Sequence, residues 1–191
     1  MKKGTIIFSA FLLLTAFTTL TTFWKSDAPH SQLGFTVTHM GIADVSGTFN
    51  DFTVTIESDK ADFSDATIEM TAQVASIDTR VEARNNHLKS ADFFDAAKYP
   101  TLYFKSTGLT KSSENEYKLK GNLTLHGVTK EVTMDLRHRG TIEDPKTKKK
   151  TAGFQVTGVI KRSDFKLGSG FPDAAISDEV RIKADGEFKQ Q

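Results

Sequence analysis

The chain contains no cysteine among its 191 residues. Without thiols it can have no disulfide framework, no thiolate nucleophile, no cysteine-ligated zinc or iron–sulfur centre, and no lipid anchor on an N-terminal cysteine. An excess of one charge is missing too, because 25 Lys and Arg balance 24 Asp and Glu. General nucleic-acid binders carry a basic excess, so nucleic acid is not an expected partner.

Sequence signatures of enzymes are also scarce. The chain has no G-x-S-x-G nucleophile elbow, no G-x-G-x-x-G or phosphate-binding loop, and no paired-carboxylate motif. His39, His87 and His126 offer three imidazoles to a metal, but they lack the close spacing of zinc motifs such as H-E-x-x-H. We therefore expect a protein without catalytic residues, metal or other cofactor.

The first residues have the pattern of a secretory signal. Two lysines precede the charge-free run Gly4–Trp24, and its most apolar part, Ile6–Phe17, has the length of a signal-peptide core. We predict a signal peptide at residues 1–23 and one domain at residues 24–191, exported to the periplasm or secreted. The alternative is an uncleaved anchor, because the charge-free run is just long enough to span a bilayer. The four threonines near its end disfavour that alternative.

Cleavage of this segment would leave a nearly neutral domain, with one more acidic than basic side chain. Such a surface has no electrostatic reason to sit on anionic lipid. We therefore expect no stable membrane anchoring after the signal is removed.

Apolar and polar residues alternate along most of the remaining chain. The polar partners are mostly Thr, Lys, Glu and Gln, which suits an antiparallel sheet with one solvated face and disfavours a parallel α/β fold. Short strands of about eight residues, separated by turns, predict a barrel or a sandwich. The alternating runs are Leu33–Val37, Phe52–Ile56, Ile68–Val74, Leu102–Phe104, Tyr117–Leu119, Leu123–Leu125, Val132–Leu136, Phe154–Val156 and Val180–Ile182.

One change of period and several turn signals interrupt the strands. Thr79 and Glu82 have the spacing of a capping box, which predicts a helix that starts near Arg80. A second, short helical turn is expected at Asp92–Ala97, ahead of Pro100. Turns are expected at Met40–Gly41, Ser46–Gly47, Ser112–Asn115, His126–Gly127, Asp144–Pro145 and Gly168–Gly170.

The distinctive residues of the chain fall in segments spread along its length. These are His30–Gly41, Val45–Phe49, Ala75–Thr79, Arg84–Asp95, Lys98–Pro100, Phe104–Ser106, Gly121–Thr129 and Arg162–Phe165. In order, spacing and residue type they resemble the YceI-like polyisoprenoid-binding family, over essentially residues 24 to 188. Two positions depart from that pattern: Asn85 stands where an acidic residue usually follows the arginine, and Lys166 stands where glycine usually follows Phe165.

The resemblance implies an all-β fold, an eight-stranded antiparallel, lipocalin-like barrel with one helix and a short helical turn between the middle strands. It implies a periplasmic binding or carrier protein that encloses a polyisoprenoid or similar long-chain lipid, either quinone-like or a polyprenol. The role would be transport or storage in isoprenoid metabolism. A homodimer is compatible with the resemblance.

The aromatic composition suits such a ligand, since the chain has 15 Phe but only one Trp and three Tyr. Phenylalanine offers a large apolar surface with no donor that needs a partner. The inward parity of the strands supplies the candidate ligand-binding residues, and Phe93 and Phe94 are candidates to plug or line one end. Each of these residues is equally a candidate for simple core packing. The set is Phe35, Val37, Phe49, Val54, Ile56, Ile68, Met70, Phe93, Phe94, Phe104, Leu119, Leu123, Met134, Phe154, Val156 and Ile182.

A polar set is expected at the barrel mouth or in structural contacts: His39, Asp78, Arg84, His87 and His126. Asp78, Arg84 and His87 would either contact a ligand head group or lock a loop through hydrogen bonds and ion pairs. Two other functions stay open. One is an enzyme or accessory factor that acts on such a lipid through the three histidines, and the other is a filled barrel that serves only as a protein-interaction module.

Overall fold

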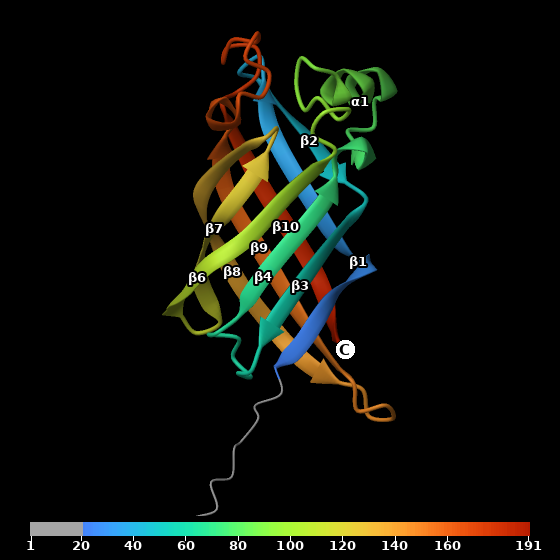
Figure 1. Ribbon diagram of the computed structural model, residues 1–191, viewed down its shortest axis with the longest axis vertical. Helices are drawn as coiled ribbons and strands as arrows, with labels where there is room; N and C mark the ends of the chain where they lie inside the picture. Colours follow the sequence, from blue (N-terminus) through green and yellow to red (C-terminus); the bar gives the residue numbers. More distant parts are fainter. Residues whose placement is uncertain (1–20) are drawn as a thin grey trace, which may run out of the picture.

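The computed structural model describes residues 21–191, which form a closed antiparallel β-barrel (Figure 1). The pairing of β10 with β1 closes the sheet, so the wall has eight strands, as predicted. In wall order they are β1 (Thr22–His39), β3 (Phe52–Ser58), β4 (Thr67–Gln73), β6 (Thr101–Ser113), β7 (Glu116–Leu125), β8 (Val128–Glu143), β9 (Lys150–Lys161) and β10 (Glu179–Gln190).

Strand β1 is long enough to pair with two different strands along one of its edges. Its first residues, Thr22–Lys25, pair with β3, and its last residues, Leu33–His39, pair with β2 (Ala43–Phe49). The short strand β5 (Ile77–Asp78) adds to the other edge of β2. The expectation of strands of about eight residues was wrong here, because β1 has 18 residues and β8 has 16.

The turn predicted at Ser46–Gly47 is also wrong, because both residues lie inside β2. Gly47 is needed there for space rather than for chain reversal. A Cβ atom at Gly47 would lie 2.5 Å from the ring of Phe35, which packs against the bare backbone from inside the barrel. The other turns fall where they were predicted, and Met40 and Gly41 reverse the chain with positive φ angles of 51° and 69°.

The only α-helix among the described residues, α1 (Glu82–Lys89), lies in the crossover from β4 to β6. It begins two residues later than predicted, and the capping box does not form, because Val81 takes the N-cap position. Thr79 instead donates its backbone N–H and its hydroxyl to Oδ1 of Asn85, at 2.8 and 2.6 Å. Arg80, with φ of 66°, turns the chain between Thr79 and the helix.

The segment Asp92–Ala97, where a short helical turn was predicted, forms consecutive hydrogen-bonded turns. It folds back on the end of α1, where the N–H of Phe94 donates to the carbonyl of Leu88 at 3.0 Å. Asp95 has a φ of 47°, which is incompatible with continuing a right-handed helix. Two single 3₁₀ turns, η1 (Val74–Ser76) and η2 (Arg162–Phe165), complete the regular structure.

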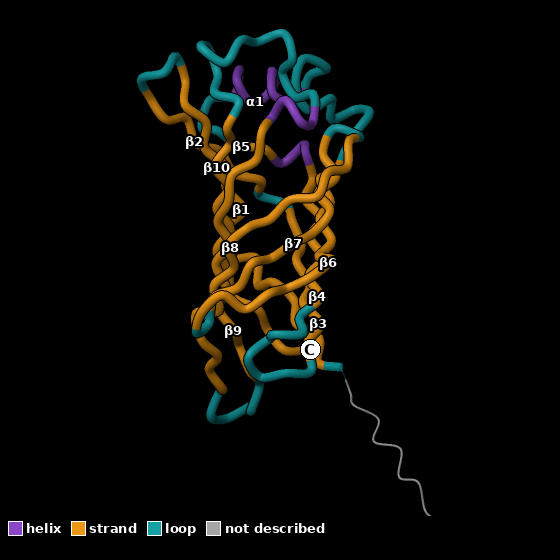
Figure 2. The backbone as a smooth tube through the Cα atoms, turned by 90° about the vertical axis from the view of Figure 1, so that its left-hand side faces the viewer, coloured by secondary structure: helices purple, strands orange, loops and turns teal. Residues whose placement is uncertain are grey.

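The two ends of the barrel differ (Figures 1 and 2). The helix end carries α1, the β1–β2 turn and the segment 166–178 that joins η2 to β10. The opposite end, called the hairpin end below, carries the β3–β4 and β8–β9 connections and the C-terminus. No helix within residues 21–191 is long and apolar enough to cross a bilayer. Most of the predicted signal peptide lies outside the described residues.

Candidate functional site

The interior of the barrel holds a cavity of about 470 Å³. Side chains of every second strand residue point into it. The apolar residues that alternate along the sequence therefore form the lining of the cavity. Every apolar residue predicted for the lining does border this cavity: Phe35, Val37, Phe49, Val54, Ile56, Ile68, Met70, Phe93, Phe94, Phe104, Leu119, Leu123, Met134, Phe154, Val156 and Ile182. The volume lies in the range of small-molecule sites, roughly 300–1,000 Å³. A barrel packed solid with side chains is therefore not what this chain forms.

Two groups of lining residues were missed by the sequence reasoning. The first shares the inward strand parity and could have been found from it: Leu33, Val45, Phe52, Leu102, Leu125, Leu136, Ile160, Val180, Ala184 and Phe188. The second comes from α1 and the segment 166–178, which have no strand periodicity: Leu88, Leu167, Phe171, Ala175 and Ile176. The helix end is thus apolar on its inner side as well.

Glycine on the inner wall gives the aromatic rings room to lie flat against the strands. A Cβ atom at Gly121 of β7 would lie 2.4 Å from the ring of Phe104 on the paired strand β6. At Gly47 and Gly121 a phenylalanine ring thus lies over bare backbone and takes less of the interior.

Polar residues of the lining are concentrated at the helix end, where His39, Arg84 and His87 border the cavity. The guanidinium of Arg84 donates from Nε to the hydroxyl of Thr79 and from a terminal nitrogen to its carbonyl, both at 2.8 Å. The ring of His87 lies 3.2 Å from a carboxylate oxygen of Asp92 and packs edge-on against Phe93. These three residues therefore give the cavity a polar rim at the helix end.

Asp78 and His126, the other two residues of the predicted polar set, do not border the cavity. Asp78 accepts hydrogen bonds from the backbone N–H of Arg80 and from the side-chain amide of Asn85, and these bonds hold the pKa of its carboxyl below the usual value. The Nδ1 atom of His126 lies 3.2 Å from the carbonyl of Phe165. Both residues therefore contact loop segments and not the cavity.

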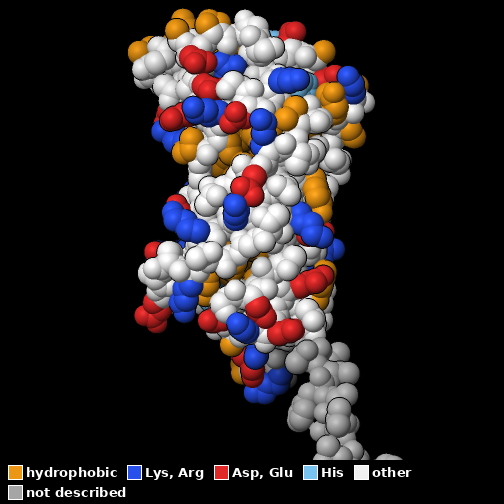
Figure 3. Space-filling model, turned by 60° about the vertical axis from the view of Figure 1, so that its left-hand side comes forward, with side chains coloured by type: hydrophobic (Ala, Val, Ile, Leu, Met, Phe, Trp, Pro, Cys, Tyr) orange, Lys and Arg blue, Asp and Glu red, His pale blue; other side chains and the backbone are white. Residues whose placement is uncertain are grey.

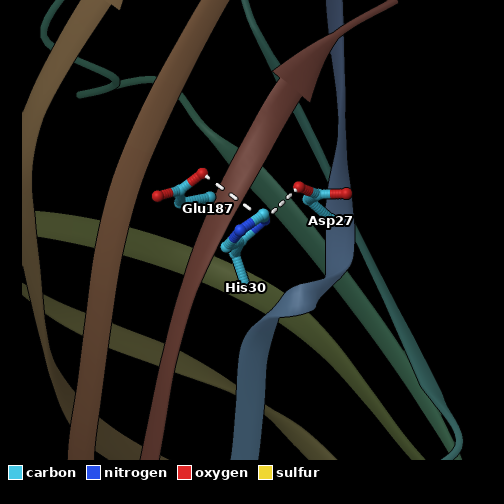
Figure 4. A group of neighbouring side chains, drawn as sticks. All are labelled: Asp27, His30 and Glu187. Carbon is cyan, nitrogen blue, oxygen red and sulfur yellow. Dashed lines mark hydrogen bonds and ion pairs between the residues drawn. The ribbon is translucent and has the colours of Figure 1, made fainter.

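The three histidines do not come together as metal ligands. Within residues 21–191, only Asp27, His30 and Glu187 place potential ligand atoms within 4.8 Å of one another (Figure 4). Nδ1 of His30 lies 2.7 Å from the Asp27 carboxylate, and the ammonium of Lys189 lies 2.9 Å from the same oxygen. Hydrogen bonds from His30 and Lys189 lower the pKa of Asp27. The group is an ion-pair cluster that bridges β1 and β10.

A buried cation that the sequence did not reveal organises the helix end. Arg162 is only 6% exposed, yet its guanidinium donates to the carbonyls of Leu167, Gly168 and Phe171 at 2.7 to 3.1 Å. It also pairs with the carboxylate of Asp173 at 3.1 Å. Because Phe171 borders the cavity, Arg162 fixes the shape of the mouth.

Aromatic side chains close the barrel at the hairpin end. Phe154 and Phe188 form the floor of the cavity, with ring centroids 5.4 Å apart. Behind them, Phe63 packs edge-on against Phe154 at 4.9 Å, and Trp24 packs on Phe63 at 5.2 Å. The cavity is therefore blind at this end and reaches the surface at the helix end, where the lining residues His39 and His87 are exposed.

Comparisons of sequence and of structure with known proteins agree on one family. The chain is 35% identical to protein YceI of Salmonella arizonae over 189 residues, which cover 97% of this chain and 98% of that protein. The crystal structure of BcnA from Burkholderia cenocepacia matches with a TM-score of 0.75 and 26% identity, covering 85% of this chain and 98% of that one.

A third match has the same fold at lower identity. It is a polyisoprenoid binding domain from Saccharophagus degradans, with a TM-score of 0.65 and 16% identity, covering 88% of this chain and 98% of that one. The model of the YceI-like domain matches residues 24–188, which is nearly the whole barrel. The chain therefore belongs to the YceI-like domain family.

Proposed function

We propose that this protein is a non-catalytic carrier that encloses a polyisoprenoid or a similar long-chain lipid in its barrel. The observation that carries the proposal is the blind, almost wholly apolar cavity between the mouth and Phe154. A small barrel either fills its interior with side chains or holds one ligand, and this one keeps its interior open.

The binding energy of such a ligand would come from its hydrocarbon chain. Burial of a CH₂ group contributes about 0.8 kcal/mol, so a five-carbon isoprene unit contributes at most about 4 kcal/mol before ordering costs. The rings of Phe35, Phe49 and Phe104 present apolar surface and leave no polar group unpaired. Specificity would then depend on the shape and length of the chain more than on hydrogen bonds.

The comparisons support the same ligand class. The structural neighbour from Saccharophagus degradans is a polyisoprenoid binding domain, and the two chains share the barrel. The lipid would need a protein to cross an aqueous compartment, which agrees with export through a signal peptide at residues 1–23. A soluble carrier in the periplasm would account for both the signal peptide and the need for a protein that moves the lipid through water.

The exterior of the helix end suits uptake from a lipid phase. Figure 3 shows apolar side chains exposed at this end of the molecule. Ile42 and Met40 of the β1–β2 turn are 88% and 58% exposed, and Val81 beside α1 is 46% exposed. The turn is held in place, because the N–H of Met40 donates to the carbonyl of Ala175 at 2.9 Å. These apolar tips would let the mouth approach a membrane while a chain slides in.

Native mass spectrometry tests the proposal directly. The protein would be purified from its own periplasm without detergent, its intact mass measured, and any bound molecule extracted into organic solvent and identified. We expect one isoprenoid or similar lipid per barrel. An apo mass, together with no uptake of an added polyprenol or quinone, would overturn the carrier function.

A further inference from the structure

A second pocket lies at the hairpin end, on the far side of the aromatic floor. It has a volume of about 380 Å³ and a mixed lining that includes Trp24, Phe63 and the polar residues Ser58 and Lys60. Phe154 and Phe188 border only the main cavity, whereas Trp24 and Phe63 border only this second pocket. The two spaces are therefore separated by a partition that is two aromatic rings thick.

Phe63 is held in this partition by an unusual backbone. Its φ is 58°, in the left-handed region that a bulky side chain rarely adopts, and the side chain is only 2% exposed. Strain of this kind persists only where the surrounding structure enforces it, and it is concentrated at functional positions. The turn between β3 and β4 thus keeps an unfavourable backbone conformation that points the Phe63 ring into the end of the barrel.

The β3–β4 turn is built to enforce that conformation. The carboxylate of Asp65 accepts the hydroxyl of Ser58 at 2.5 Å and the backbone N–H of Asp59 at 3.1 Å. The hydroxyl of Tyr117, on β7, donates to the carbonyl of Asp62 next to Phe63. The turn is therefore held by bonds within itself and by a bond to β7, two strands away in the wall, which a simple hairpin connection would not require.

We infer that the Phe63–Phe154 partition sets the longest apolar chain that the barrel can enclose. This inference rests on the proposed function and adds to it a specificity for the length of the lipid chain. A chain that enters at the helix end fills the cavity until it meets Phe154, and further isoprene units stay in water and add no affinity. Loss of the Phe154 ring would lower the floor of the cavity to Phe63. Loss of Phe63 would leave a space beside Phe154 into which a longer chain can displace the Phe154 ring, so in both variants longer chains would gain buried surface.

The test is a titration of the folded protein with farnesol, geranylgeraniol and solanesol, prenols of increasing length. In the unmodified protein the affinity should rise with chain length and then stop rising. In Phe154→Ala and Phe63→Ala that limit should move to a longer prenol. The first prenol beyond the original limit should bind at least about tenfold tighter than to the unmodified protein, against an upper bound of about a thousandfold per isoprene unit.

The chain offers matched controls for lost core volume and for lost stability. Phe165→Ala removes the same side chain from a position that is 1% exposed but borders neither pocket, and it should leave the limit unchanged. Val156→Phe adds a ring one inward position above Phe154 on β9, without emptying the core, and should move the limit to a shorter prenol. This second variant tests the inference even if the alanine variants fold poorly.

Trp24, the only tryptophan of the chain, gives a local readout. Its ring packs on Phe63, so in Phe63→Ala a long prenol should change the Trp24 emission, while farnesol should not. An unchanged length limit in folded Phe154→Ala, Phe63→Ala and Val156→Phe, with farnesol still bound, would overturn this inference alone. Failure of the unmodified protein to bind any of the prenols would overturn the proposed function together with it.

Discussion

A single charge placed in the middle of the cavity wall should abolish lipid binding and leave the barrel folded. Met70 of β4 pairs with Val54 of β3 on one side and with Phe104 of β6 on the other, and Phe104 pairs with Leu123 of β7. All four side chains border the cavity, so they form an apolar belt across four strands. The change Met70→Glu keeps the side-chain length and inserts a carboxylate into this belt.

The expected size of the effect follows from dehydration. In the empty barrel the cavity has room for water around the new carboxylate, so the fold loses little stability. A bound hydrocarbon chain would expel that water, and an unpaired buried charge costs several kcal/mol. Binding should therefore weaken by at least about a thousandfold, since each 1.4 kcal/mol is a factor of ten.

The assay is prenol binding measured beside near-ultraviolet circular dichroism, over a range of pH. Because the protonated acid is far cheaper to bury than the carboxylate, affinity of Met70→Glu should return in part as the pH falls. Thr71→Glu puts the same charge on the next residue, which points out of the barrel and does not border the cavity, and should bind normally. Unchanged affinity of folded Met70→Glu would refute the placement of ligand in this cavity.

Three further predictions concern stability and dynamics. Burial lowers the pKa of His138, which packs against both Phe63 and Phe154, so the unfolded chain takes up a proton first as the pH falls below about 6.5. Urea denaturation should show stability falling with pH in that range, and His138→Phe should flatten the dependence. Arg162→Met should lower the free energy of unfolding by about 3 kcal/mol or more, because five carbonyls lose their donor and those of Leu167 and Gly168 are in buried bonds; a loss below about 1 kcal/mol would contradict the role of Arg162. Hydrogen exchange of α1 should be the fastest of any helix or strand of the barrel, because none of its eight residues is buried; protection equal to that of β7 would contradict this.

The lining of the cavity was predictable because one physical rule determines it. In a strand, residues two apart share a face, so Val54 and Ile56, or Phe154 and Val156, had to point the same way once the segments were strands. The sheet then needed only to close for that face to become an interior. Phe93 and Phe94 do not follow this rule, since they lie in the turns after α1 and border the cavity from the helix end.

The features that the sequence did not reveal depend on contacts between distant segments. Thr79 has the residue type of a helix cap, but its hydroxyl instead donates to Asn85 and accepts from Arg84. The helix therefore begins later and has no side-chain cap. The pair Ser46–Gly47 has the composition of a turn, but Gly47 lies in a strand and leaves space for the ring of Phe35. Local propensity gave the wrong answer at both positions, because tertiary packing used the same residues for another purpose.

The helix end and the hairpin end are held by opposite means, and this difference supports a direction for lipid movement. At the hairpin end, Trp24, Phe63 and Phe154 are each less than a tenth exposed and pack ring against ring. At the helix end, α1 contributes no buried residue and is fastened by polar bonds from Thr79 and Arg84. A helix with no buried side chain can move without opening a void, whereas packed rings must create one to separate. A chain should therefore enter and leave past α1, and the aromatic floor should stay in place while it does.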